Sequence, residues 1–216
     1  MSSPQRLSHQ TTNQRVFELV AGGDLLATRV LDVGAGEGYF SRLLGEHVKS
    51  RFAVPPATVL RACDLYPALF RYPDVSCDPI AADGRLPYPD GSFDVACSIE
   101  VIEHLEDQFA FARELHRVLK PDGRAIITTP NVLNLNSRVR TLHSGLAVLF
   151  DPLPLASPDP VHTSGHIHPI PFYYLGYVFH RAGFRQLRVH YDRTKKSAVA
   201  WLLLLAPFIF PARALA

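Results

Sequence analysis

Residues 30–40 read VLDVGAGEGYF, which joins an apolar run to a glycine-rich turn and the start of a helical pattern. Glycine lets the backbone turn sharply and lets a ligand approach without meeting a Cβ atom. The N-terminus of the following helix favours electronegative groups. The spacing is G-x-G-x-G, which differs from the G-x-G-x-x-G of dinucleotide sites. This stretch therefore predicts a strand, a ligand-binding turn and a helix.

Apolar strands alternate with amphipathic helices along most of the chain. Helical patterns cover residues 10–21, 39–48, 107–119 and 174–183. Strand patterns cover residues 28–34, 57–64, 75–80, 92–99, 124–129 and 184–192. This alternation is typical of an α/β protein, a Rossmann-like, mostly parallel doubly wound sheet with helices on both faces. We expect a single domain over residues 1–216 with its core at 10–192.

The composition is that of a globular protein with little net charge. Of 216 residues, 47% are hydrophobic and 19% charged, and the formal net charge is only +2. This charge gives no support for nucleic acid as a partner. The three cysteines have no C-x-x-C spacing, which suits a reducing compartment. The polar first residues lack an apolar signal-peptide core. The expected location is therefore cytoplasmic.

A proline-rich segment at residues 130–170 separates the predicted fifth strand from the last predicted helix. Long loops inside compact domains are usually functional or disordered. This one leaves the carboxyl end of a strand, which is the edge where open α/β sheets bind ligands. We interpret the segment as a substrate lid.

Residues 198–210, AVAWLLLLAPFIF, form an uninterrupted apolar segment. Its length is below the roughly 18 residues that a membrane-spanning helix needs. One interpretation is a last buried strand or helix of the domain. The other is peripheral contact with the inner membrane face or a lipid substrate, which Lys195 and Lys196 would favour beside anionic headgroups.

Three aspartates follow predicted strands or turns. Asp32 stands just before the glycine turn, where its charge would repel a pyrophosphate and attract an ammonium. Asp64 ends the second strand, where a carboxylate can accept both hydroxyls of a ribose. Asp83 precedes the fourth strand. These residues predict a ligand that contains a ribose and an ammonium group and that needs no phosphate-binding loop. S-adenosylmethionine (SAM) fits this description.

The chain resembles a class I SAM-dependent methyltransferase, of the broad family that includes the ubiquinone-pathway O-methyltransferases. The resemblance covers about residues 29–185 and lies in the segments LDVGAGEG, CDLYP, AADGRLPYPDGSFDVACSIEVIEHLED, ELHRVLKPDGRAIITTPN and AGF. It implies a seven-stranded sheet whose final strand is antiparallel. Residues 198–205 are the candidate for the seventh strand. The resemblance also implies S-adenosylhomocysteine as the product of the cofactor.

The resemblance implies roles for the matching residues. The methionine part of the cofactor would lie beside Asp32, Gly34, Ala35, Gly36 and Gly38. The ribose would lie at Asp64 and Leu65, the adenine at Ala82 and Asp83, and the sulfonium near Ser98 and Glu100.

Residues 98–107, SIEVIEHLED, place carboxylates and an imidazole directly after the fourth strand. If residues 100–104 form a helical turn, Glu100, Glu103 and His104 share one face. They are the candidate catalytic residues, and His104 could act as a base or contact the acceptor.

Two other interpretations of this stretch remain open. The same three residues could bind a divalent metal, as in relatives with an E-x-x-E-H metal motif, with His168 or His166 of GHIHP as a further ligand. Alternatively, His104 is structural, and Glu106 and Asp107 favour the start of the next helix.

The leading functional prediction is a SAM-dependent methyltransferase that modifies a small-molecule or lipid/glycan-linked acceptor at oxygen. The alternatives are an RNA 2′-O-methyltransferase with an E-x-x-E-H metal site and a non-catalytic SAM-binding protein. The near-neutral charge argues against the RNA substrate. The acceptor and the oligomeric state stay open.

Overall fold

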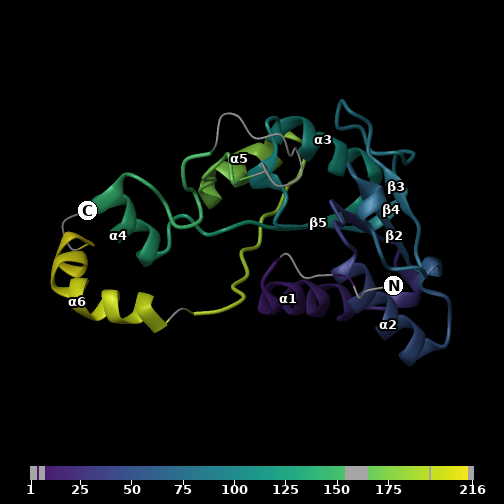
Figure 1. The fold of residues 1–216 in the computed structure, drawn as a ribbon, viewed down its shortest axis with the longest axis horizontal. Coiled ribbons are helices and arrows are strands. Elements are labelled where there is room, and N and C mark those ends of the chain that lie inside the picture. The colour runs from purple at the N-terminus through teal and green to yellow at the C-terminus, as the bar shows by residue number, and fades with distance from the viewer. Residues whose placement is uncertain (1–3, 5–7, 154–164, 195, 214–216) are drawn as a thin grey trace.

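A computed structural model describes residues 4, 8–153, 165–194 and 196–213. Within them, five parallel strands form one sheet in the order β3-β2-β1-β4-β5 (Figure 1). The strands are β1 (Val30–Val33), β2 (Leu60–Asp64), β3 (Cys77–Pro79), β4 (Phe93–Ile99) and β5 (Leu119–Thr128). Because all run the same way, their carboxyl ends meet at one edge, where such sheets bind ligands.

Helices cover both faces of the sheet, which confirms the predicted Rossmann-like doubly wound class (Figure 1). The α-helices are α1 (Gln10–Ala21), α2 (Tyr39–Phe52), α3 (Gln108–Val118), α4 (Leu135–Ser144), α5 (Phe172–Arg181) and α6 (Lys196–Arg213). Short 3₁₀ helices are η1 (Leu25–Ala27), η2 (Pro56–Thr58), η3 (Pro67–Leu69) and η4 (Ile102–His104).

The sheet separates two hydrophobic clusters. Helices α1 and α2 pack with Val30, Leu60 and Val95 on one face, whereas α3 and α5 pack with Leu31 and Phe93 on the other. All four residues of β1 are buried, as expected for a central strand covered on both faces. This packing fixes the backbone from which the glycine turn departs.

Residues 184–192, predicted as a sixth strand, form no strand in the structure. The Thr12 hydroxyl donates a hydrogen bond of 2.6 Å to Asp192, and a guanidinium nitrogen of Arg15 lies 3.5 Å from the His190 ring. These contacts hold the segment against α1. Among the described residues, β5 therefore has no strand partner on its outer edge.

Residues 198–205, the candidate for a seventh strand, lie in helix α6. The run of leucines has a high helix propensity, and no neighbouring strand is present to pair with it. The described part of the sheet thus has five strands, two fewer than predicted. Residues 198–210 lie in a helix, one of the two buried elements considered, but in its described side chains Val199, Leu203 and Leu204 are exposed, which disagrees with burial of this part.

The predicted lid, residues 130–170, lies partly outside the described residues, because residues 154–164 are not described. Its first part contains α4, and its end, 165–170, returns to the sheet edge beside η4. The single domain over 1–216 and the core at 10–192 stay predictions. In the described parts of the chain, no helix combines the length and apolar character needed to cross a bilayer.

Candidate active site

The glycine turn connects β1 to α2 in a conformation that requires glycine. Gly34, Gly36 and Gly38 have φ angles of 72°, 54° and 87°, in the left-handed region that glycine adopts without strain. A Cβ atom on Gly34 would lie 2.6 Å from the Val101 side chain, and one on Gly38 would lie 2.6 Å from the Phe70 ring. Gly38 also begins α2. The predicted ligand-binding turn is present at the carboxyl edge of the sheet.

Asp64 ties the glycine turn to the end of β2. One carboxylate oxygen accepts a hydrogen bond of 2.8 Å from the Gly36 amide, and the other accepts one of 2.8 Å from the Tyr66 amide. The adjacent Leu65 is exposed. A carboxylate oxygen has two lone pairs, so both oxygens retain a position for a ligand hydroxyl. This arrangement fits the predicted ribose role of Asp64.

Asp32 lies beneath the turn and is almost fully buried. The Ser41 hydroxyl of α2 donates a 2.7 Å hydrogen bond to Asp32 Oδ2. Burial raises the pKa of Asp32 to about 7, with the nearby Asp64 charge adding to the shift and the Ser41 hydrogen bond opposing it. Contact between Asp32 and a ligand ammonium stays a prediction. The Ser41 partner of Asp32 is not predictable from the sequence pattern.

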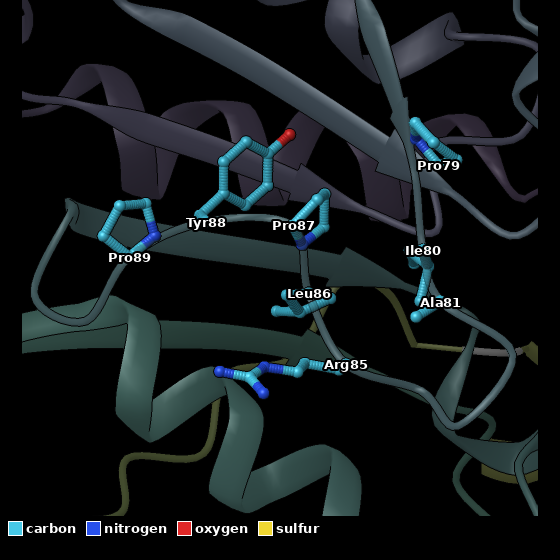
Figure 2. Close-up of a pocket in the computed structure, with 8 residues that line it drawn as sticks. All are labelled: Pro79, Ile80, Ala81, Arg85, Leu86, Pro87, Tyr88 and Pro89. Atoms are coloured by element: carbon cyan, nitrogen blue, oxygen red, sulfur yellow. The ribbon is translucent and has the colours of Figure 1, made fainter.

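Ala82 and Asp83, the predicted adenine contacts, lie on an exposed loop after β3. The Arg85 amide donates a 3.0 Å hydrogen bond to Asp83. An open hollow of about 600 Å³ flanks this loop. Figure 2 shows its lining residues, which are Pro79, Ile80, Ala81, Arg85, Leu86, Pro87, Tyr88 and Pro89. Because none of them belongs to the glycine turn or to η4, we do not place the reaction in this hollow.

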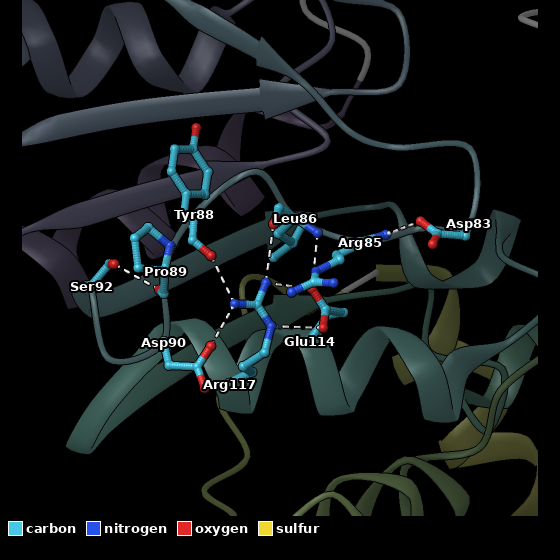
Figure 3. Close-up of polar contacts among 9 residues, drawn as sticks. All are labelled: Asp83, Arg85, Leu86, Tyr88, Pro89, Asp90, Ser92, Glu114 and Arg117. Carbon is cyan, nitrogen blue, oxygen red and sulfur yellow. Dashed lines mark hydrogen bonds and ion pairs between the residues drawn. The ribbon is translucent and has the colours of Figure 1, made fainter.

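Arg117 of α3 clamps the loop that follows Asp83 (Figure 3). Its guanidinium donates hydrogen bonds of 2.7 Å to the Tyr88 carbonyl and 3.0 Å to the Leu86 carbonyl. It also binds Glu114 with two nitrogens, at 2.8 and 2.7 Å. Glu114 in turn accepts a 2.9 Å hydrogen bond from the Leu86 amide. None of the sequence predictions includes these contacts of Arg117, although the i, i+3 spacing of Glu114 and Arg117 on a helix indicates an ion pair.

Ser98 and Glu100 lie at the carboxyl end of β4. The Ser98 hydroxyl is buried and has no hydrogen-bond partner among the described residues. Glu100 has a φ of 56°, a strained value for a residue with a side chain. The Thr128 hydroxyl of β5 donates a 3.0 Å hydrogen bond to its carboxylate, and burial raises the Glu100 pKa. Strain of this kind concentrates at functional sites.

Glu103 in η4 is fully buried, and within the described residues neither carboxylate oxygen has a hydrogen-bond partner. Burial raises the pKa of Glu103 to about 8, and the nearby Glu100 charge adds to the shift. The Glu103 backbone amide and the Thr129 hydroxyl oppose the shift, although neither has the distance and angle of a hydrogen bond to the carboxyl. A buried carboxyl without a partner is costly to maintain, and in native proteins it calls for a specific reason. A proton-transfer role or a cation would supply one.

Two histidines surround the Glu103 carboxyl. His166 Nε2 lies 4.0 Å from Glu103 Oε1, and the ring centroids of His104 and His166 are 4.9 Å apart. Burial and the neighbouring His104 lower the His166 pKa, which favours the neutral imidazole. One ligand atom from each of the three residues lies within 4.8 Å of the others. We call Glu103, His104 and His166 the proton-transfer cluster.

The backbone brings His166 to this cluster from a distant part of the chain. The Glu103 carbonyl accepts hydrogen bonds from the amides of Ile167 and His168, at 3.0 and 3.1 Å. His104 Nδ1 lies 3.3 Å from the Gly165 carbonyl. The segment 165–168 is thereby held against η4.

The helical turn considered for residues 100–104 is present only in its second half, as η4 (Ile102–His104). Glu100 has a left-handed backbone and lies before η4, so it does not share a helical face with Glu103 and His104. His168, considered as a further metal ligand, contacts Gln108 instead. Its Nδ1 atom lies 2.7 Å from Nε2 of the Gln108 side chain. The structure thus favours His166 over His168 as the third member of the cluster.

The helix after this stretch begins as predicted. Asp107 accepts a 2.8 Å hydrogen bond from the Ala110 amide and so caps α3. Glu106 is exposed. Asp107 and Glu106 thus lie at the start of α3, as predicted.

The family model described as "Methyltransferase domain" matches residues 6–189, which include every part of the site described above. The chain belongs to this methyltransferase family. A relative from Mycolicibacterium smegmatis, named "Probable S-adenosylmethionine-dependent methyltransferase", is 36% identical over 125 residues, covering 57% of this chain and 44% of the relative. SAM is accordingly the cofactor of this methyltransferase domain.

A second relative is the ubiquinone biosynthesis O-methyltransferase of Xanthomonas oryzae pv. oryzae, which is 33% identical over 133 residues, covering 59% of this chain and 54% of the relative. The chain thus spans about half the length of these two methyltransferases. Among solved structures, phosphoethanolamine N-methyltransferase 2 of Haemonchus contortus has a TM-score of 0.57 at 18% identity, over 94% of this chain and 43% of that one. This similarity shows the class I methyltransferase fold.

The residues at the sheet edge fit SAM. Asp64 stands at the end of β2 with capacity for ribose hydroxyls, and its hydrogen bond to the Gly36 amide holds the glycine turn beside it. The unpartnered Ser98 hydroxyl at the end of β4 offers a further polar contact. The contacts of individual residues with the cofactor stay predictions.

Proposed function

We propose that this methyltransferase domain transfers a methyl group from SAM to a hydroxyl oxygen of a small-molecule or lipid-linked acceptor. The observation that carries the proposal is the proton-transfer cluster, in which a buried carboxyl without a hydrogen-bond partner meets two imidazoles beside the end of β4. The cluster follows the strand next to β1, so it shares the carboxyl edge of the sheet with the glycine turn.

Methyl transfer to a hydroxyl requires a group that accepts the hydroxyl proton, and this cluster can supply it. Bound SAM supplies a methyl group on a sulfonium, whose leaving group needs no proton. An acceptor hydroxyl, in contrast, must lose its proton as its oxygen attacks. His104 and His166 can accept that proton at a ring nitrogen, and the Glu103 carboxyl beside them can stabilise the resulting positive charge. A Glu103 pKa of about 8 lies close to neutral pH, which suits proton exchange.

A metal-assisted version has a specific observation in its favour. Glu103, His104 and His166 offer one oxygen and two nitrogen ligand atoms in close proximity, a set that suits Zn²⁺ or Mn²⁺. A cation held there would supply Lewis acidity toward the acceptor hydroxyl. It would also give the unpartnered Glu103 carboxylate a counter-charge.

The oxygen acceptor is supported by the O-methyltransferase relative. An RNA acceptor is less favoured, because the net charge of +2 provides little attraction for a phosphate backbone. A non-catalytic SAM-binding role gives no reason to keep a buried, unpartnered carboxyl next to two histidines.

Two measurements test the proposal. Calorimetry with S-adenosylhomocysteine should show binding, and its absence would overturn the cofactor assignment. A methyl-transfer assay with labelled SAM and matched acceptors, in which a hydroxyl is replaced by a methoxy group or by hydrogen, should show transfer to the hydroxyl compounds alone. Transfer to an amine or a carbon instead would overturn the oxygen acceptor while leaving SAM dependence intact.

A further inference from the structure

Helix α6 exposes apolar side chains that no part of the described fold covers. It is an 18-residue helix in which a continuous apolar run follows Lys196 and Ser197. The exposed fraction reaches 73% for Leu203 and 64% for Leu204. The other large exposed side chains of its described part are Val199, Trp201 and Leu202. Such a concentration on one element marks an interaction site.

Helix α4 lies beside α6, and the two stand away from the sheet (Figure 1). The Asn136 side chain of α4 donates a 2.8 Å hydrogen bond to the Ser197 hydroxyl of α6. Leu142 of α4 is 90% exposed, which extends the apolar surface onto this helix. We call the two helices together the α4–α6 surface.

The charges on the α4–α6 surface are of one sign. Neither helix contains an aspartate or a glutamate. Arg138 on α4 and Lys196 at the start of α6 are exposed, as is Arg193 just before it. Arg140 forms an ion pair with Asp151, and the Arg193 guanidinium donates a 3.5 Å hydrogen bond to the Thr11 hydroxyl of α1, so Arg193 belongs to the contact with α1. Arg138 donates a 2.9 Å hydrogen bond from Nε to the Leu133 carbonyl, and its terminal nitrogens together with Lys196 supply the positive charge of this surface. Basic side chains beside exposed leucines complement a partner that has an anionic surface and an apolar interior.

We propose that the α4–α6 surface binds the surface of an anionic phospholipid bilayer. The apolar side chains of residues 199–204 enter the boundary between headgroups and acyl chains, where exposed leucine and tryptophan are stabilised. Arg138 and Lys196 lie at the level of the phosphate groups, which attract them. The charge complementarity selects a lipid surface over a second copy of the chain, because two such basic surfaces would repel each other.

This placement does not depend on the chemistry of the proton-transfer cluster. The α4–α6 surface is separate from η4 and from the glycine turn, so lipid binding and methyl transfer can be measured independently. A protein that binds vesicles without methyl transfer would leave this inference standing and overturn the proposed function, and the reverse result would do the opposite.

The full chain contains a single tryptophan, Trp201, which reports directly on the proposed surface. Titration with phosphatidylcholine–phosphatidylglycerol vesicles should shift its fluorescence emission to shorter wavelength, and the protein should co-sediment with the vesicles. The double variant L203E/L204E should lose at least about tenfold in vesicle affinity, because charged side chains resist transfer into the boundary. L26E, at a leucine exposed on η1, is the matched control and should bind as the unmodified chain does.

Three results would overturn the inference. The first is an unshifted Trp201 emission together with no co-sedimentation. The second is equal affinity for vesicles of phosphatidylcholine alone, which would remove the anionic partner. The third is a dimer in light scattering without lipid that L203E/L204E converts to a monomer, because a second copy of the chain would then occupy the surface. Circular dichroism of each variant shows whether it is folded.

Discussion

The carboxylate Oε1 atom of Glu103 lies 4.0 Å from His166 Nε2, although the two residues come from distant parts of the chain. The contact depends on two backbone hydrogen bonds that join the Glu103 carbonyl to the amides of Ile167 and His168. The buried Glu103 carboxyl thus acquires its second neighbouring imidazole, in addition to that of His104, only when residues 165–168 are in place.

Replacing His166 with alanine should lower kcat about 100-fold, because the acceptor proton loses one of its two receiving groups. Affinity for S-adenosylhomocysteine should be unchanged, since Asp64 and the glycine turn are untouched. His143→Ala, at an exposed histidine on α4, is the control. Steady-state kinetics and calorimetry check both expectations, and an unchanged kcat would remove His166 from the reaction.

Asp64→Ala should weaken S-adenosylhomocysteine binding roughly tenfold, because a hydrogen bond to a charged group contributes about 1.5 kcal/mol. Asp74→Ala removes a carboxylate that pairs with Lys49 on the surface, and should bind the ligand as the unmodified chain does. Calorimetry compares the two variants. Equal dissociation constants would show that Asp64 holds no cofactor hydroxyl.

Arg117→Lys keeps the positive charge but loses the planar fork that reaches Glu114 and two loop carbonyls. We expect the KM for SAM to rise severalfold, while the KM for the acceptor stays constant, because the clamped loop follows Asp83. The free energy of unfolding should fall by about 2 kcal/mol. Arg113→Lys, exposed on the same helix, is the control. A loss of stability with no change in the KM for SAM would reduce the clamp to a purely structural role.

The pKa of Asp32, raised by burial to about 7, predicts a pH dependence of stability. Between the ordinary pKa near 3.8 and about 7, the unfolded chain releases a proton that the folded chain retains. Stability contributed by Asp32 is therefore greatest at low pH and falls as pH rises through this window, by up to about 1.4 kcal/mol per pH unit.

Asp32→Asn should remove this contribution. Urea unfolding of both proteins from pH 4 to pH 8 gives the difference in unfolding free energy, which should shift in favour of the variant as pH rises. Ser41→Ala is a useful companion, because it removes the hydrogen bond that opposes the shift and should extend the pH dependence of stability to higher pH. A difference that is constant with pH would contradict a raised Asp32 pKa.

If the proton-transfer cluster binds a divalent cation, adding Zn²⁺ or Mn²⁺ to chelator-treated protein should raise the Tm of the unmodified chain. At a metal concentration of 100 times the Kd, the expected stabilisation is about 2.7 kcal/mol. Glu103→Gln should lose this shift, whereas His168→Ala should retain it, because His168 contacts Gln108 instead. If neither chelator nor metal changes the Tm of the unmodified chain, the cluster binds no metal, and proton transfer without a metal is the remaining interpretation.

The sequence predicted the parts of the site that follow from local order. The strand, the glycine turn and α2 are contiguous, and the parallel arrangement then brings Asp64 to the same edge. Asp107 was predicted as a cap because its side chain acts on an amide three residues away. The turn and the cap depend on residues that are close together in the sequence, and the position of Asp64 follows from the parallel order of neighbouring strands.

Features set by tertiary contacts could not be predicted in the same way. The sequence alone does not distinguish His166 from His168. Only the packing of residues 165–168 against η4 decides which of the two histidines lies beside Glu103. The strained backbone of Glu100 overrides the helical spacing of its neighbours. Residues 184–192 have a strand pattern, yet Asp192 finds its hydrogen-bond partner on α1.

The hydrogen bonds from residues 167 and 168 to the Glu103 carbonyl have a consequence for how this enzyme family could diversify. The turn and the carboxylate that we predict to contact the cofactor come from residues 30–64, whereas the second imidazole comes from a separate, later segment. Under the proposed function, we expect substitutions in that later segment to change acceptor preference and to leave donor affinity intact. Exchange of residues 165–168 between relatives would then alter acceptor specificity on an unchanged cofactor site.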